Sequence, residues 1–209
     1  MSSSTFGDRQ ARLQQMQAAQ SAQERRRSFL VIGVAVLVAA LLIGTVVAVI
    51  VQSESQRQEV AGAAEQPIEG VQEFPDQSQE HVETAVDYPQ SPPVGGDHLP
   101  VWQNCGYYAA PVPEGAGVHA LEHGAVWVGY DPALATDQVE TLRELSADNP
   151  YLLVSPVEDL EAPVVASAWG SQLAVEDVDD ERLSVFLVKY LQGEQTPEPG
   201  APCTGGING

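Results

Sequence analysis

The chain of 209 residues carries 29 acidic side chains against nine basic ones, which gives a formal net charge of −20. A surface this acidic repels nucleic acid and anionic lipid, so the composition excludes a nucleic-acid-binding protein and favours basic partners or cations. Solubility is the simpler explanation of the same charge.

An apolar run without any charge covers residues 29–51, and Thr45 is its only polar side chain. About 20 residues of α-helix span the hydrocarbon core of a bilayer, and a helix satisfies its backbone groups internally. The run therefore predicts one transmembrane helix, Phe29–Val51, that anchors the chain in a membrane. A cleaved signal peptide is the alternative, but its apolar core usually has only about 7–15 residues.

Charge is distributed unequally about this helix. Residues 1–28 hold five arginines against two acidic residues, a net charge of +3, which leaves −23 for residues 29–209. Because basic flanks remain in the cytoplasm, we expect residues 1–28 to be a cytoplasmic tail and the C-terminal part to lie outside the cell membrane. The arginines are Arg9, Arg12, Arg25, Arg26 and Arg27.

Composition divides the outer part further. Residues 52–79 are rich in Gln, Glu, Ser, Gly and Pro, and such a segment buries too little apolar surface to order itself, so we expect a flexible stalk. Residues 80–209 then form the extracytoplasmic domain, with a compact part that ends near Gln192 and an extended C-terminal tail. A compact part of roughly 110 residues is within the usual size range of a single domain.

Within this domain the hydrophobic pattern predicts an α+β fold. Residues 81–118 are rich in Pro and Gly and are expected to be irregular, with short strands at best. After them the predicted order is β-α-β-β-α, which indicates a small α/β sandwich with both helices on one face of the sheet. The predicted elements are strands at 125–130, 151–154 and 164–169 and helices that start at 136 and at about 180.

The two cysteines, Cys105 and Cys203, both lie on the outer side of the predicted membrane helix. Thiols in that compartment tend to be oxidised, and two cysteines permit only one pairing, so we predict a disulfide between them. Closing a loop of this length stabilises a fold by roughly 4–5 kcal/mol in the chain-entropy model. Two thiolate metal ligands are the alternative, which the absence of a CxxC pair disfavours.

All four histidines lie between residues 81 and 123, and imidazole is the commonest protein ligand of metal ions. His98 ends the motif PPVGGDH, whose prolines stiffen a loop that can hold the ring at a fixed point. His119 and His123 are four residues apart and share a face of either a helix or a strand. Gly124 suits the position that follows a helix end, so we expect a short helical turn and then a strand.

The imidazoles of His98, His119 and His123 are therefore predicted to converge on one metal ion. Three nitrogen ligands with an open position suit zinc or copper(II). A copper(I) carrier is disfavoured because both methionines precede the membrane segment. His81 is either a fourth ligand or a residue of the stalk. The alternative to a metal site is that the histidines form hydrogen bonds with the backbone and have a structural role.

Residues 119–123 also match the H-x-x-E-H pattern of inverted zinc peptidases, in which the glutamate activates water. Those motifs lie inside a long helix, whereas here Gly124 and a β-rich run follow at once. The pattern nevertheless defines an enzymatic alternative, a metal-dependent hydrolase in which Glu122 is the general base. The sequence leaves open whether the protein is an enzyme.

The motifs together resemble those of a family of uncharacterised bacterial proteins, mainly actinobacterial and membrane-anchored, that share a domain of unknown function. The resemblance covers about residues 80–203, and the residues that carry it are Tyr88, Pro92-Pro93-x-x-Gly96-x-His98, Gly106-x-Tyr108, Val118-His119-x-Leu121-Glu122-His123-Gly124-x-Val126 and Trp169-Gly170. Where the family usually has Thr or Ser and then Gly after the two prolines, this chain has Val94-Gly95, so we expect the loop to lack a hydroxyl contact that the resemblance implies.

Some members of that family resemble accessory subunits of the cytochrome bc–cytochrome oxidase supercomplex. The resemblance implies a membrane-anchored accessory or binding module that docks on a respiratory membrane complex. With the histidine motifs, the preferred hypothesis is such a module with a metal site.

Overall fold

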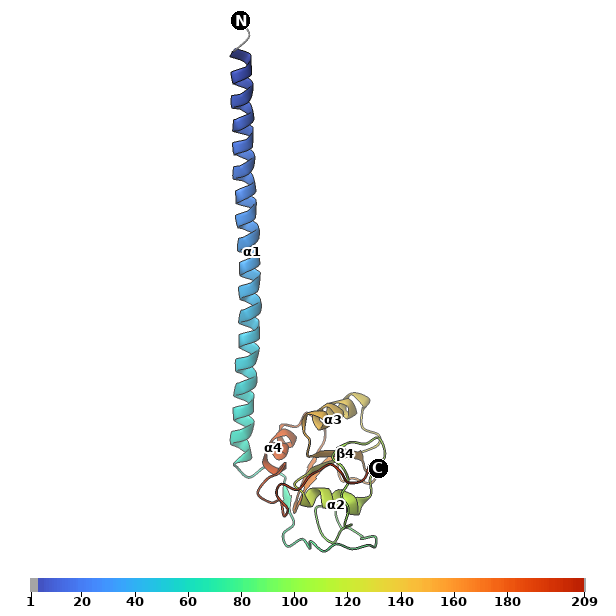
Figure 1. Ribbon diagram of the computed structural model, residues 1–209. Helices are drawn as coiled ribbons and strands as arrows, with labels where there is room; N and C mark the ends of the chain where they lie inside the picture. Colours follow the sequence, from blue (N-terminus) through green and yellow to red (C-terminus); the bar gives the residue numbers. More distant parts are fainter. Residues whose placement is uncertain (1–3, 209) are drawn as a thin grey trace. The chain divides into compact units, whose positions relative to one another are not determined.

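The computed structural model in Figure 1 describes residues 4–208. Within that range the side chains of residues 4–15, 17–24, 26, 28–31 and 35 lie outside the described part. Three of the arginines behind the predicted orientation, Arg9, Arg12 and Arg26, are among them. The chain divides into two compact units, Met1–Gln56 and Arg57–Gly209, which are described in turn.

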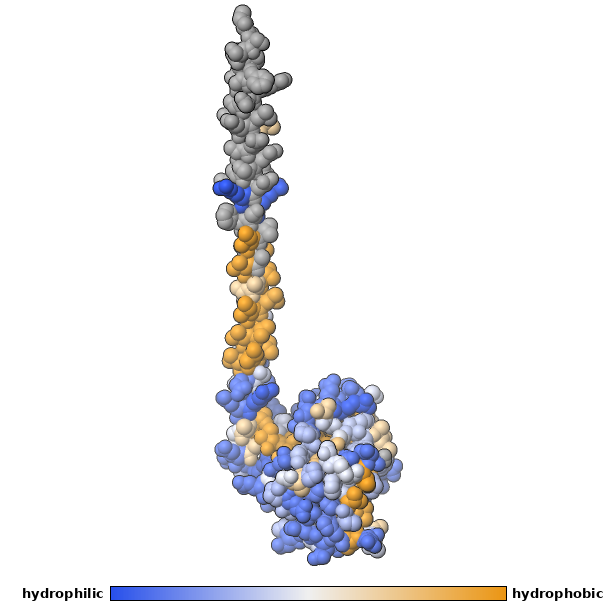
Figure 2. All heavy atoms as spheres, viewed as in Figure 1, coloured by the Kyte–Doolittle hydropathy of each residue, from blue (hydrophilic) through white to orange (hydrophobic). Residues whose placement is uncertain are grey.

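Helix α1, Ser4–Ala64, provides the structure of the first unit and continues into the second. Its part from Ile32 is long and apolar enough to cross a membrane. The large apolar side chains from Ile32 to Val51 are exposed, and Figure 2 shows them as a continuous hydrophobic band. This band overlaps the predicted membrane segment 29–51.

The range 52–79 differs from the flexible stalk that the composition predicted. Helix α1 extends through it as far as Ala64, and strand β1, Gln72–Glu73, lies near its end. Gln, Glu, Arg and Ala are good helix formers, and adding residues to an existing helix needs no new nucleation. The polar composition is therefore compatible with a solvated continuation of the apolar helix.

The second unit is built on a mixed sheet of six strands in the order β1-β6-β5-β3-β4-β2. Strand β3 pairs in parallel with β4 and antiparallel with β5, and β5 and β6 form an antiparallel hairpin. The further strands are β2 (Gly106–Tyr107), β3 (Val126–Tyr130), β4 (Leu152–Pro156), β5 (Val164–Ala168) and β6 (Ser171–Val175).

Helices cover both faces of this sheet. Helices α3, Thr136–Asp148, and α4, Glu181–Tyr190, pack on the face that carries Val126 and Val128, whereas α2, Glu114–Glu122, packs on the face that carries Trp127 (Figure 1). Alternate residues of a strand point to opposite faces, which is why neighbours on β3 belong to different cores. The α+β class and the placement of α3 and α4 on one face agree with the sequence prediction.

The predicted order β-α-β-β-α omits strand β6. Ala168 pairs with Ser171, so the two residues Trp169 and Gly170 alone connect β5 to β6. Gly170 has a φ of +70°, a backbone conformation that tight hairpin turns require and that glycine adopts without strain. The hairpin therefore continues the sheet where the sequence analysis ended it.

Helix α2 lies unusually close to the sheet. A Cβ atom on Gly117, in the middle of the helix, would lie 2.5 Å from the ring of Trp127 on β3. The helix ends as the sequence predicted, because Gly124 has a φ of +94° and its N–H donates to the carbonyl of Leu121. The N–H of Ala125 donates to the carbonyl of Ala120, and the chain then enters β3.

The C-terminal tail is attached to the domain near α2. Cys105 and Cys203 lie at disulfide distance, as predicted, with their Cα atoms 5.4 Å apart. The N–H of Cys105 donates to the carbonyl of Cys203, and the hydroxyl of Tyr151 donates to that of Ala201. The tail is therefore held against the domain by hydrogen bonds on both sides of a cysteine pair that lies at disulfide distance.

Candidate metal centre

Four side chains gather at one end of α2 with potential ligand atoms within 4.8 Å of one another: His81, His98, His119 and Glu122. Three of them are buried, while the side chain of His81 is 44% exposed. The group contains two of the three predicted ligands and the predicted glutamate. It also contains His81, whose role the sequence left open, and it leaves out His123.

His98 is held by the proline loop, which is fixed to the sheet. The carbonyl of Pro92 accepts hydrogen bonds from the hydroxyl of Ser167 and the amide of Gln172. The loop then turns at Gly96, whose φ of +107° suits glycine, and the Gly96 carbonyl lies 2.8 Å from Nδ1 of His98. The predicted role of this motif as a rigid support for His98 agrees with these contacts.

His119 and Glu122 lie three residues apart on α2, so both side chains project from one side of the helix. Nδ1 of His119 lies 2.6 Å from the carbonyl of Leu99. A carbonyl oxygen only accepts hydrogen bonds, so Nδ1 carries the proton in this ring and in that of His98. Each ring therefore presents Nε2 to the group. Metal-binding histidines are usually oriented in this way, by donating their other N–H to a backbone carbonyl.

The carboxylate of Glu122 lies among these rings. Its Oε2 is 3.0 Å from Nε2 of His98 and 3.5 Å from Nε2 of His81. A neutral His98 whose proton is on Nδ1 directs a lone pair at this carboxylate oxygen, and the two repel each other in a buried environment. A cation between them, either a proton or a metal ion, converts the repulsion into attraction.

His119 is a neutral ring near pH 7. Burial lowers its pKa to about 4, against the opposing effect of the hydrogen bond to Leu99, and the neighbouring histidines His123, His98 and His81 lower it further. A metal ion binds the neutral imidazole, so this ring is available as a ligand without first losing a proton.

His81 reaches the group through pairing of two distant segments. The N–H of Val82 donates to the carbonyl of His98, and the N–H of His98 donates to that of Glu80. The His81 ring stacks on His119 with a centroid distance of 4.8 Å. His81 has no motif of its own, and only this backbone pairing identifies it as a neighbour.

His123 lies beside the group and faces the C-terminal tail. Its ring centroid is 4.6 Å from that of His119, but its Nδ1 donates to the carbonyl of Pro202 and its Nε2 is 3.5 Å from a carboxylate oxygen of Glu198. On a helix, Glu122 is rotated about 60° from His119 in one direction and His123 about 40° in the other. The group is on the Glu122 side, so the predicted set of three ligands is not the set that the structure brings together.

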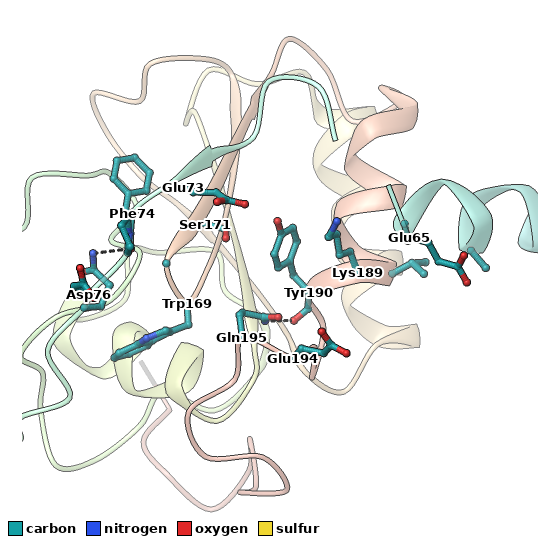
Figure 3. Close-up of a pocket in the computed structure, with 16 residues that line it drawn as sticks. Glu65, Glu73, Phe74, Asp76, Trp169, Ser171, Lys189, Tyr190, Glu194 and Gln195 are labelled. Carbon is teal, nitrogen blue, oxygen red and sulfur yellow. Dashed lines mark hydrogen bonds between the residues drawn. The ribbon is translucent and has the colours of Figure 1, made fainter. Parts of the chain in front are cut away.

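Two tryptophans flank the histidines. Trp102 contacts the rings of His119 and His123, and Trp169 contacts His98 edge-on at a centroid distance of 5.9 Å. Trp169 also lines a cavity of about 850 Å³, and Figure 3 shows its ring on one side of that cavity with Lys189 on the other. The cavity is lined by residues other than the four of the group.

The four side chains would have to draw closer together to hold a tetrahedral ion. In a tetrahedral site with zinc–ligand distances of about 2.1 Å, each pair of ligand atoms lies about 3.4 Å apart. The widest separation in the group is within 4.8 Å. Shortening the widest separation by up to about 1.4 Å would bring all four ligand atoms onto one tetrahedral ion, and the exposed His81 is the member with most freedom to move.

Comparison with known families places this group within a family domain. The family described as "Protein of unknown function (DUF3105)" matches residues 81–205, a range that starts at His81 and contains the whole group and both cysteines. No curated protein and no solved structure matches the chain. From the extent of this match, the chain belongs to the DUF3105 family.

Proposed function

We propose that this protein is a membrane-anchored module whose extracytoplasmic domain binds one divalent metal ion through His81, His98, His119 and Glu122. The observation that supports it most is the buried 3.0 Å contact between Nε2 of His98 and Oε2 of Glu122, in a ring whose Nδ1 already donates to the Gly96 carbonyl. Oriented Nε2 atoms beside a carboxylate are a usual ligand set for metal ions in proteins.

The chemistry of the ligand atoms favours zinc or copper(II). Three imidazole nitrogens and one carboxylate oxygen are ligands of intermediate to hard character, which suit these two ions. Soft sulfur ligands are absent from the group, and Cys105 and Cys203 lie at disulfide distance from each other. Copper(I), which prefers thiolate and thioether ligands, is therefore disfavoured.

A binding role is better supported than the hydrolase alternative. The side chain of Glu122 is 3% exposed and its carboxylate already contacts two imidazoles, which suits a metal ligand. A general base needs access to a substrate-bound water. A cavity of about 850 Å³ in the described part of the chain is lined by residues other than Glu122 and the three histidines.

The membrane anchor determines where this module would act. The exposed apolar surface of α1 suits a lipid environment, and the arginines before it favour a cytoplasmic N-terminus and an extracytoplasmic domain. Docking on a respiratory membrane complex remains a prediction from the family resemblance alone.

Metal analysis of the full-length protein in detergent tests the proposal. After dialysis against zinc or copper(II) and removal of free ions, we expect one equivalent of metal per chain. His98→Asn keeps a donor for the Gly96 carbonyl but removes Nε2, and should weaken binding at least tenfold. Wild-type protein that binds neither ion, or a His98→Asn variant that binds as tightly as wild type, would contradict the proposal.

A further inference from the structure

The four members of the group differ sharply in their access to solvent. His98, His119 and Glu122 are 0%, 5% and 2% exposed, whereas the side chain of His81 is 44% exposed. An ion held by all four is therefore closed off on three sides and reachable past His81. An external ligand can approach the ion only along that side.

The four side chains also differ in how firmly the fold holds them, and the exposed His81 is again the exception. His98 and His119 each donate Nδ1–H to a backbone carbonyl, and Glu122 lies on a helix packed against the sheet. His81 is positioned by the pairing of its segment with the one around His98, an isolated bridge outside any named strand. Three ligands thus form a fixed base, and the fourth is on an exposed segment.

We propose that His81 is an exchangeable ligand, and that the protein is a metal donor that passes its ion to an acceptor protein presenting an imidazole. This inference rests on the metal site proposed above. A site meant for permanent retention gains from burying every ligand, because burial excludes competing ligands and solvent. An exposed fourth ligand beside three buried ones instead provides an entry point for an acceptor.

The exchange is a simple ligand substitution. A neutral imidazole nitrogen of the acceptor donates its lone pair to the ion while the bond between the ion and Nε2 of His81 breaks. One metal–nitrogen bond forms and one is lost, His81 remains neutral, and the oxidation state of the ion is unchanged. As the acceptor supplies further ligands, the bonds from the ion to His98, His119 and Glu122 break in turn and the ion leaves with the acceptor.

The test compares zinc release from full-length wild type, His81→Ala and His98→Asn, with Glu83→Gln as a matched control at a nearby exposed position. Zinc leaving the protein is captured by a chromophoric chelator, and free imidazole serves as the acceptor ligand. We expect the release rate of wild type to rise with imidazole concentration. The His81→Ala variant should still bind one zinc but release it at least tenfold faster. The control should behave as wild type.

Cobalt(II) as a spectroscopic probe distinguishes the outcomes further, because its visible absorption reports the number of ligands. Added imidazole should restore the wild-type spectrum in the His81→Ala variant by occupying the vacated position. If the His81→Ala variant binds no zinc, His81 is a permanent ligand. If its release rate equals that of wild type, His81 is not part of the site. The first result overturns this inference alone, and the second also removes His81 from the proposed set of ligands. A wild type that binds no metal overturns the proposed function as a whole.

Discussion

Nε2 of His98 and Oε2 of Glu122 lie 3.0 Å apart in the interior of the domain, while Nδ1 of the same ring is bonded to the Gly96 carbonyl. Replacing the carboxylate by an amide should resolve this contact without a cation, since the amide N–H₂ can donate to Nε2. For Glu122→Gln we expect unchanged or higher stability without metal, and a loss of zinc affinity of at least tenfold.

Thermal unfolding of the metal-free variant and a zinc competition titration measure these two effects. The two measurements are informative together, because a general destabilisation would lower both the stability of the metal-free protein and its affinity for zinc. A Glu122→Gln variant with wild-type zinc affinity would show that the carboxylate is not a ligand.

The histidines of α2 provide a second comparison. His119→Asn and His123→Asn both retain a side-chain donor for the backbone carbonyl that each ring contacts, and both remove Nε2. We expect His119→Asn to abolish zinc binding or to lower the affinity for zinc at least tenfold. We expect His123→Asn to leave zinc binding unchanged. Equal effects of the two substitutions would indicate that His123 belongs to the metal site after all.

The lowered pKa of His119 makes the metal-free domain sensitive to acid. The ring binds a proton near pH 6.5 when the chain is unfolded and near pH 4 when it is folded. Between these pH values the unfolded state binds more protons than the folded state. The contribution of this ring to the free energy of unfolding is therefore fully present above pH 6.5 and is lost as the pH falls towards 4. The loss is about 3 kcal/mol at most.

Chemical denaturation of the metal-free protein at several pH values between about 4 and 7 measures this loss. The His119→Asn variant has no titrating ring at this position, and its stability should fall less steeply over the same interval. Parallel curves for the two proteins would show that another group is responsible.

The cysteine pair is expected to support the fold rather than the metal site. Cys105 and Cys203 are 98 residues apart in sequence, and closing such a loop contributes about 4–5 kcal/mol in the chain-entropy model. The double variant Cys105→Ser, Cys203→Ser should lose stability of this order in urea denaturation. Its zinc affinity under native conditions should be close to that of wild type. A stability equal to wild type would mean that the two thiols are not joined in the protein.

Sequence patterns were sufficient for the amphipathic helices and for the strands that form short apolar runs, which are buried along their whole length. Helix α3 starts at Thr136, as expected, and the side chain of Asp180 caps α4 by accepting from the N–H of Arg182. Strand β6 was missed because its polar Ser171 and Gln172 interrupt the apolar run that marks a buried strand, although both are buried. The signal for it was the dipeptide Trp169-Gly170, which was noted as a motif and not as a two-residue hairpin turn.

The candidate site likewise contains positions that a local sequence pattern predicts and positions that it does not. Positions on one helix follow from helical geometry, so Glu122 could be expected near His119. His81 depends on contacts between segments far apart in the chain, which no local pattern contains. His123 was misplaced because residues four apart share a face only approximately, and the side on which the loop of His98 packs decides which neighbour of His119 joins it.

Gly117 has no side chain, and this allows α2 to pack closely against β3. The ring of Trp127 occupies the space where a Cβ atom at position 117 would lie. His119 and Glu122 move with that helix as one rigid pair, whereas His98 is fastened to the sheet through its own loop. The absence of a side chain at Gly117 therefore sets the distance between His98 and the pair formed by His119 and Glu122. Any larger residue at this position would move both helix ligands away from His98.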